Sequence, residues 1–130
     1  MKFALIPAAL LSLALAAPAF AAPAAPADGL EMVGSNPKKV VKFNHSTHKA
    51  IECTVCHHPV DGKENFAKCA TAGCHDDLAG KKGTKSLYYV VHNKKDTKFQ
   101  TCLQCHDKIV AEKPDLKKDL TGCAKSKCHP

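Results

Sequence analysis

Apolar residues are unevenly distributed along this chain of 130 residues. Residues 3–17 are almost wholly apolar, with Lys2 before them and the small-residue sequence Ala19-Phe20-Ala21 after them. This order is typical of a secretory signal peptide, and the run is short for a bilayer span. We therefore predict a signal peptide over residues 1–21, no membrane span in the rest, and one exported domain over residues 22–130.

The rest of the pattern predicts little regular structure. Residues 22–28 read as a Pro/Ala tether. Short apolar stretches at 30–33 and 40–43 predict two strands, and Gly-Ser-Asn-Pro between them predicts the turn of a small hairpin. Three short helices are expected, at 84–95 with Thr84 as N-cap, at 100–106 and at 115–120. The remaining residues are predicted to form loops and turns.

The predicted domain is too poor in large apolar residues to fold around them. It has 19 Val, Leu, Ile and Phe residues and no Trp. This share of about 17 % is below the roughly 20 % typical of folded chains. Such a chain cannot bury enough surface to offset its conformational entropy. Something other than aliphatic side chains must supply the core.

The charge narrows the choice of partners. The formal net charge is +7, every basic residue is Lys, and Arg is absent. Nucleic-acid binding proteins favour Arg for bidentate contacts, so lysine alone argues against nucleic acid. An acidic protein partner, attracted by electrostatic steering, suits this composition better.

Cysteine and histidine form a repeated unit. The eight cysteines fall into four pairs, two spaced C-x-x-C and two with four residues between. A histidine follows the second cysteine of every pair. The pairs with their histidines are Cys53/Cys56 with His57, Cys69/Cys74 with His75, Cys102/Cys105 with His106, and Cys123/Cys128 with His129.

Three kinds of site compete to explain this unit. A disulfide framework suits an exported chain, but it gives histidine no role. Structural zinc could use two thiolates and an imidazole, but adjacent Cys and His residues rarely reach one zinc ion. Covalent attachment of c-type haem requires both thiols and the next histidine, and C-x-x-C-H is its known signal. The favoured prediction is four covalently attached haems, which would also form the missing core.

The remaining histidines match the number of irons. Outside the repeated units the chain has four histidines, His45, His48, His58 and His92. Four haem irons each need a sixth ligand, and Met32 is the only methionine in the predicted domain. We therefore expect bis-histidine iron, which has a low reduction potential and no open position for a substrate.

Adjacent histidines imply closely spaced haems. His57 and His58 cannot easily bind the same iron, so they are expected to bind two different irons. With Cα atoms about 3.8 Å apart and about 6.5 Å from each Cα to its iron, these irons lie within roughly 17 Å. His45 and His48, three residues apart, would tie a second close pair in the same way.

These motifs resemble those of the tetrahaem cytochrome c3 family, small periplasmic electron carriers of sulfate-reducing bacteria. The likeness covers residues 28–130 and rests on FNHSTHK, CTVCHHPV, CATAGCH, CLQCH, LTGCAKSKCH and the isolated His92 after two tyrosines. It implies a mainly irregular multihaem domain with a few short α-helices, a small N-terminal β-hairpin and a core of four haems. It also implies the histidine partners, which are His45 with His57, His58 with His75, His48 with His106, and His92 with His129.

The resemblance also implies a function. Such a protein would be no enzyme, and it would shuttle electrons from periplasmic hydrogenase to membrane-bound cytochrome complexes in anaerobic sulfate respiration. It would be a monomer that docks through lysines near the fourth haem, which are Lys81, Lys82, Lys85, Lys94, Lys95, Lys98, Lys113, Lys117, Lys118, Lys125 and Lys127. The competing hypothesis is a multihaem reductase, which would need one spare histidine to leave its iron open.

Overall fold

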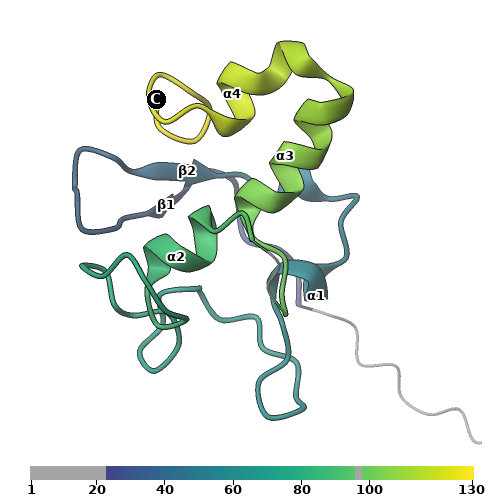
Figure 1. Ribbon diagram of the computed structural model, residues 1–130. Helices are drawn as coiled ribbons and strands as arrows, with labels where there is room; N and C mark the ends of the chain where they lie inside the picture. Colours follow the sequence, from purple (N-terminus) through teal and green to yellow (C-terminus); the bar gives the residue numbers. More distant parts are fainter. Residues whose placement is uncertain (1–22, 96–97) are drawn as a thin grey trace, which may run out of the picture.

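The computed structural model describes residues 23–95 and 98–130 (Figure 1). The predicted signal peptide lies outside these residues. Within them, no helix has both the length and the apolar character needed to cross a membrane.

The predicted hairpin is confirmed. Strands β1 (Leu30–Met32) and β2 (Val41–Phe43) pair antiparallel, with Leu30 opposite Phe43 and Met32 opposite Val41. These four side chains are half-buried while the residues between them are exposed, as alternation along a one-sided sheet requires. Asn36 closes the turn, since its side-chain and backbone oxygens accept the backbone N–H groups of Lys38 and Lys39.

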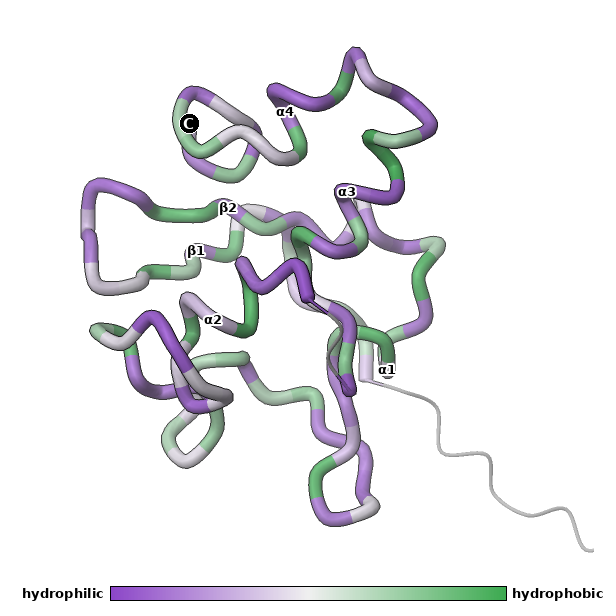
Figure 2. Tube along the Cα trace, in the orientation of Figure 1, coloured by the Kyte–Doolittle hydropathy of each residue, from purple (hydrophilic) through white to green (hydrophobic). Residues whose placement is uncertain are grey.

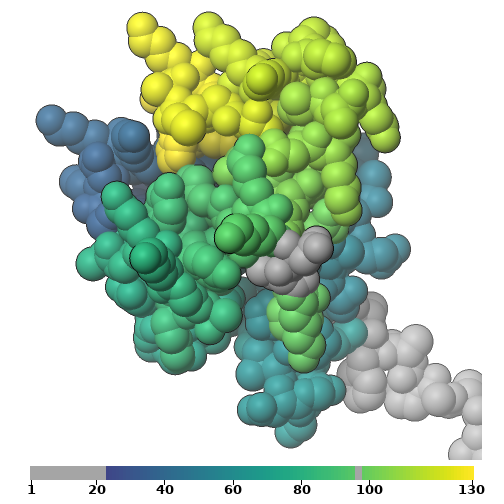
Figure 3. All heavy atoms as spheres, in the orientation of Figure 1, coloured from purple at the N-terminus to yellow at the C-terminus, as the bar shows by residue number. Residues whose placement is uncertain are grey.

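Six short helical segments follow the hairpin in the part of the chain that the structure describes. They are η1 (Ser46–His48), α1 (Cys53–Cys56), α2 (Leu87–His92), α3 (Cys102–Glu112), η2 (Pro114–Leu116) and α4 (Lys117–Thr121). The C-terminal helices pack on one another, and the last residues lie beside them on the same side of the molecule (Figures 1 and 3).

The N-cap predicted for the first long helix is wrong. Thr84 and Lys85 lie in a turn, and Ser86 is extended because it pairs with Asp77 in a short parallel bridge. Helix α2 therefore starts after Ser86, whose buried hydroxyl accepts the Tyr89 backbone N–H. It ends at His92, because the Asn93 side chain accepts the Lys95 N–H and starts a turn.

Helix α3 is longer than the predicted 100–106. Thr101 and Gln104 form a capping box at its start, and the helix continues to Glu112 just before Pro114. The segment predicted at 115–120 is a turn of 3₁₀ helix followed by α4.

The described residues lack an apolar core. Leu87 is the one buried hydrophobic residue among them, and the other buried residues are Ser86, Thr101 and Ser126. Apolar positions are scattered in short segments along the trace (Figure 2). Large apolar side chains such as Tyr88, at 47 % exposure, and Leu78, at 40 %, have no protein partner sufficient to cover them.

Candidate haem sites

Two of the cysteine pairs lie on helices. In α1 and in α3 the pair occupies positions i and i+3, which share one helix face. In α1 the His57 backbone N–H bonds to the Cys53 carbonyl at 2.8 Å, so the histidine follows directly from the turn that carries both thiols. In α3 the helix continues through His106.

The two wider pairs lie on tight loops. In the first, the His75 backbone N–H returns to the Cys69 carbonyl at 3.0 Å, and Gly73 adopts φ +85°. In the second, the buried Ser126 hydroxyl accepts the His129 N–H, and Lys125 adopts φ +51°. Each wider pair has two more residues between its cysteines than C-x-x-C. In each loop one residue in the left-handed conformation turns the chain back on itself and so accommodates them.

The eight histidine rings face one another in four pairs. The ring centres lie 6.5 Å apart for His45 and His57, 6.2 Å for His48 and His106, 5.8 Å for His58 and His75, and 6.2 Å for His92 and His129. Each pair joins one spare histidine to one motif histidine. They are the same four pairs that the family resemblance implied.

These separations fit one metal ion between each pair of rings. With nitrogen about 2 Å from a metal and each ring centre about 1.1 Å behind its nitrogen, the centres would be roughly 6.2 Å apart. The observed 5.8–6.5 Å brackets this value, whereas stacked rings such as Tyr88 and His92 are 4.2 Å apart. The paired rings are therefore spaced for a shared ligand rather than for direct contact.

Backbone carbonyls fix which nitrogen carries the proton in most of these rings. In the described chain, five of the eight rings place Nδ1 within hydrogen-bond distance of a carbonyl, which can only accept. These are His48 to Asn44, His58 to Pro59, His75 to Thr84, His92 to Tyr88, and His106 to Leu120. Nδ1 then carries the proton and Nε2 keeps its lone pair for a metal. This is the tautomer that iron ligation requires.

Aromatic rings pack against all four spare histidines. Phe43 contacts both His45, at 5.0 Å between ring centres, and His48, at 4.7 Å. Phe99 stacks on His58 and Tyr88 stacks on His92, both at 4.2 Å and 16° between planes. A motif histidine is held by its cysteine neighbour, whereas a spare one needs another support. The sequence does not mark these aromatics as supports. Tyr88 and His92 have the i,i+4 spacing of helix neighbours, whereas Phe99 and His58 are far apart in the chain.

Asp28 holds the segment that carries His45 and His48. Its carboxylate accepts hydrogen bonds from the Ser46 hydroxyl and, at 3.0 Å, from the Ser46 backbone N–H. These bonds lower the pKa of Asp28, with the Ser46 side chain the largest cause. The sequence predicts that Asp28 ends a Pro/Ala tether, and these bonds fasten that end of the tether to η1.

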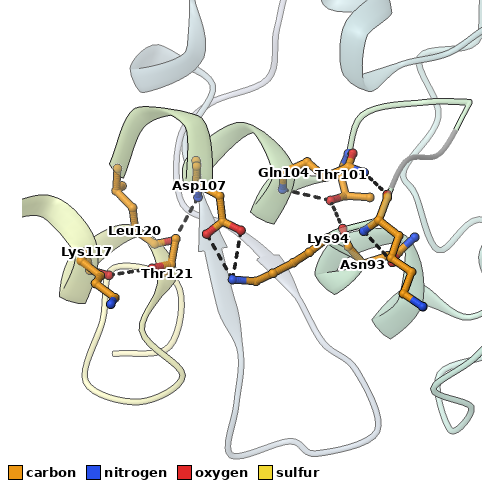
Figure 4. A network of polar contacts seen from close by, with 10 residues as sticks. Asn93, Lys94, Thr101, Gln104, Asp107, Lys117, Leu120 and Thr121 are labelled. Atoms are coloured by element: carbon orange, nitrogen blue, oxygen red, sulfur yellow. Dashed lines mark hydrogen bonds and ion pairs between the residues drawn. The ribbon is translucent and has the colours of Figure 1, made fainter. Parts of the chain in front are cut away.

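A polar network joins the ends of α2 and α3 (Figure 4). The Thr101 hydroxyl donates to the Asn93 carbonyl at 2.6 Å, and Lys94 forms an ion pair with Asp107 at 3.0 Å. Asn93 follows His92 in the chain and Asp107 follows His106. The network therefore ties together histidines that belong to two different pairs.

The cysteine thiols sit in surroundings that disfavour charge. Cys102 is exposed as a residue, yet protein atoms crowd it, and this desolvation raises the pKa of its thiol to about 12. The charges of Cys56, Cys69 and Cys128 raise the pKa further, so sulfurs of different pairs lie within electrostatic reach of one another. Desolvation likewise raises the pKa of Cys56 and Cys69. The attachment points thus gather around one region of the molecule.

The other two explanations of the repeat find no counterpart in the structure. All eight cysteines are free, although an exported disulfide framework would pair them. In the described parts of the chain, no three His, Cys, Asp or Glu side chains converge as zinc ligands would. A small multihaem cytochrome is the class of protein that needs this arrangement, because its porphyrins occupy the space that apolar side chains fill elsewhere.

Comparison with known proteins identifies the family. The family model described as Class III cytochrome C family matches residues 18–129. A cytochrome c3 of Nitratidesulfovibrio vulgaris is 55 % identical over 106 residues, covering 81 % of this chain and 80 % of the relative. A cytochrome c3 of Maridesulfovibrio salexigens is 38 % identical over 112 residues, covering 82 % and 95 %. The structure of cytochrome c3 from Desulfovibrio desulfuricans Essex 6 superposes with a TM-score of 0.80 at 64 % identity, covering 84 % of this chain and all of that one.

The chain therefore belongs to the class III cytochrome c family. It carries four c-type haems and is an electron carrier rather than an enzyme. The predicted fold class, a small and mainly irregular multihaem cytochrome with an N-terminal hairpin, is confirmed.

Proposed function

We propose that each haem is attached through one cysteine pair and lies between two histidine rings. The sets are Cys53, Cys56, His57 and His45; Cys69, Cys74, His75 and His58; Cys102, Cys105, His106 and His48; Cys123, Cys128, His129 and His92. The observation that carries this proposal is the set of four ring pairs with centres 5.8–6.5 Å apart.

This ligand set suits a low-potential carrier. Two neutral imidazoles would stabilise ferric iron more than a methionine thioether does, and together they would leave no open position for a substrate. The carbonyls that hold the Nδ1 protons strengthen the effect by making the opposite nitrogens more basic. Since His57 and His58 are neighbours, two sites are also fixed close to each other, which favours fast electron exchange between them.

The spectrum of the reduced protein before and after carbon monoxide tests the ligand set. We expect four low-spin haems per chain and no change on adding carbon monoxide, because no axial position is free. A carbon monoxide shift in one haem would refute the ligand set and point to the multihaem reductase considered above.

We further propose a periplasmic carrier that takes electrons from hydrogenase and delivers them to membrane-bound complexes in sulfate respiration. The leader over residues 1–21 would direct its export. Lysines gather near the His92–His129 pair: Lys81 lies over the Tyr88 ring at 5.9 Å, and Lys94 follows α2. Lys39, on the hairpin turn, belongs to the same group of lysines. The pKa of His129 is lowered by desolvation first, then by the charge of His92 and then by that of Lys39, so Lys39 lies within electrostatic reach of His129. An acidic partner surface would dock here.

The rate of reduction by hydrogenase under hydrogen tests this docking surface. Lys39→Gln and Lys81→Gln should each slow the reaction about twofold or more at low ionic strength, with the difference vanishing at high salt. Lys63→Gln is the matched control, because Lys63 pairs with Val60 in a turn that follows the adjacent histidines His57 and His58. Equal slowing by all three variants would indicate net charge alone, and it would exclude a local docking surface.

A further inference from the structure

One of the four histidine pairs has a different geometry. The ring planes meet at 7° for His45 and His57, at 29° for His48 and His106, and at 5° for His92 and His129. For His58 and His75 the angle is 61°, so this pair alone is crossed. The ring centres are nevertheless 5.8 Å apart, within the range that a shared metal allows.

The plane of His75 is fixed by its own loop. Its Nδ1 donates to the Thr84 carbonyl at 2.5 Å, a short bond that spans nine residues. Thr84 in turn lies shortly before Ser86, which pairs with Asp77. Rotation of the His75 ring would break this bond, so the plane of His75 is fixed. The angle between the two ring planes therefore depends on what holds the His58 ring.

His58 lacks a comparable hydrogen-bonded anchor. Its Nδ1 reaches only the carbonyl of its neighbour Pro59, at 3.2 Å, and that acceptor moves with the same piece of backbone. What lies flat against the ring is Phe99, with centres 4.2 Å apart and planes 16° from parallel. A stacked ring at this distance leaves little room for the imidazole to turn.

Phe99 itself is well placed to act as a support. It lies two residues before Thr101, which is buried, caps α3 and bonds to the Asn93 carbonyl. The Lys98 ammonium lies over its ring, 5.2 Å from the ring centre. The backbone of Phe99 is thus positioned by the start of α3, and the face of its ring packs against the His58 ring.

We propose that Phe99 is a positioning residue that sets the plane of His58 and keeps one of the four axial imidazole pairs crossed. The proposal rests on the ligand set given above. An imidazole donates π-electron density perpendicular to its plane, so parallel rings act on the same iron d orbital and crossed rings act on two. Crossing therefore changes the spacing of the iron d orbitals in the ferric state, which electron paramagnetic resonance reports as a larger maximum g-value.

The oxidised holoprotein gives a direct test that needs no variant. We expect three low-spin signals typical of near-parallel imidazoles and one signal with a distinctly larger maximum g-value. Four signals of the near-parallel type would overturn the proposal. A high-spin signal would instead refute the bis-histidine ligand set, so the two failures are distinguishable.

Three variants then assign the cause. Phe99→Leu removes the flat face, so the large-g signal should move toward the other three, while Phe99→Tyr should retain it. Phe66→Leu is the matched control, because Phe66 contacts the motif histidine His57 at 5.6 Å with planes tilted by 53°. All variants are compared at four haems per chain. An unchanged large-g signal in Phe99→Leu would overturn the role of Phe99. If that variant does not take up four haems, Phe99→Met replaces it under the same criterion.

Discussion

At the scale of single residues, the cysteine before each motif histidine is a support that the spare histidines lack. The motif histidines His75 and His106 also bond to backbone carbonyls, whereas a spare histidine depends on a carbonyl, an aromatic ring or both. His92 shows the full set: its Nδ1 bonds to the Tyr88 carbonyl at 2.9 Å while the Tyr88 ring stacks on its face. One residue thus fixes both the tautomer and the plane of this imidazole.

Removal of one spare histidine should open one iron. In His92→Ala we expect carbon monoxide to shift the spectrum of one haem in four, because alanine has no group that can bind iron. Asn93→Ala is the control, since it removes the side-chain acceptor of the Lys95 N–H but leaves His92 and the backbone carbonyl that Thr101 bonds in place. Reduced protein is titrated with carbon monoxide and followed by visible absorption. No shift in His92→Ala would show that His92 is not a ligand.

The left-handed residue in the first wide cysteine loop should be costly to replace. Gly73 has φ +85° and open space where a Cβ would point, so Gly73→Ala isolates the backbone cost of about 1–2 kcal/mol. Gly34→Ala, also in open space but without positive φ, should be neutral or slightly stabilising. Denaturant unfolding of the two holoproteins compares them. Equal effects would mean that the Gly73 loop relaxes to another conformation.

At the scale of secondary-structure elements, local signals predicted what local forces determine. The hairpin was predictable because alternation and a Gly-Ser-Asn-Pro turn specify it within 14 residues. The start of α2 was not, because Asp77, which lies outside the helix, pairs with Ser86 and holds it extended. Helix α3 was predicted too short because Asp107 and Lys108 interrupt the apolar pattern, although the helix continues past them to Glu112, with Val110 half-buried.

The hydrogen bonds of Thr101 at the start of α3 should contribute measurably to the free energy of unfolding. The Thr101 hydroxyl accepts the Gln104 N–H and donates to Asn93, so Thr101→Ala removes two bonds from a buried position. We expect a loss of about 1–2 kcal/mol in the free energy of unfolding, while Thr101→Ser, which keeps the hydroxyl, should lose less than half of that. Denaturant titration of the holoproteins checks this. If Thr101→Ala left the free energy of unfolding unchanged, the stability of α3 would have to come from its haem contacts alone.

At the scale of the whole molecule, counting residues predicted the cofactor but not its surroundings. Four cysteine pairs and four spare histidines indicated four haems from composition and spacing alone, whereas the histidine partners needed the family resemblance. Phe43 and Tyr88 contact histidines that lie close to them in the chain, whereas the contact of Phe99 with His58 joins segments that meet only in three dimensions. The same is true of Lys39, which reaches the His92–His129 pair from the hairpin turn.

The haem-free chain should be unfolded. In the described residues, Leu87 is the one buried hydrophobic side chain, and it contributes about 2 kcal/mol. Ordering the backbone costs about 1–2 kcal/mol per residue, so this burial offsets the ordering of one or two residues. The helices are too short to persist alone, since α3, the longest described, has 11 residues. Haem binding is then also folding, as metal binding is in zinc-dependent domains.

Producing the chain without residues 1–21, so that it is not exported, should yield such a haem-free protein. We expect its far-ultraviolet circular dichroism to lack helical signal and its backbone to be cleaved rapidly by trypsin at lysines, which are abundant and mostly exposed. The holoprotein under the same conditions should show helical signal and resist cleavage. A haem-free chain with a cooperative thermal transition would contradict this, because it would require a core that the described side chains do not form. The scattered apolar residues would then have to rearrange around one another, and the four ring pairs would no longer need a metal to explain their spacing.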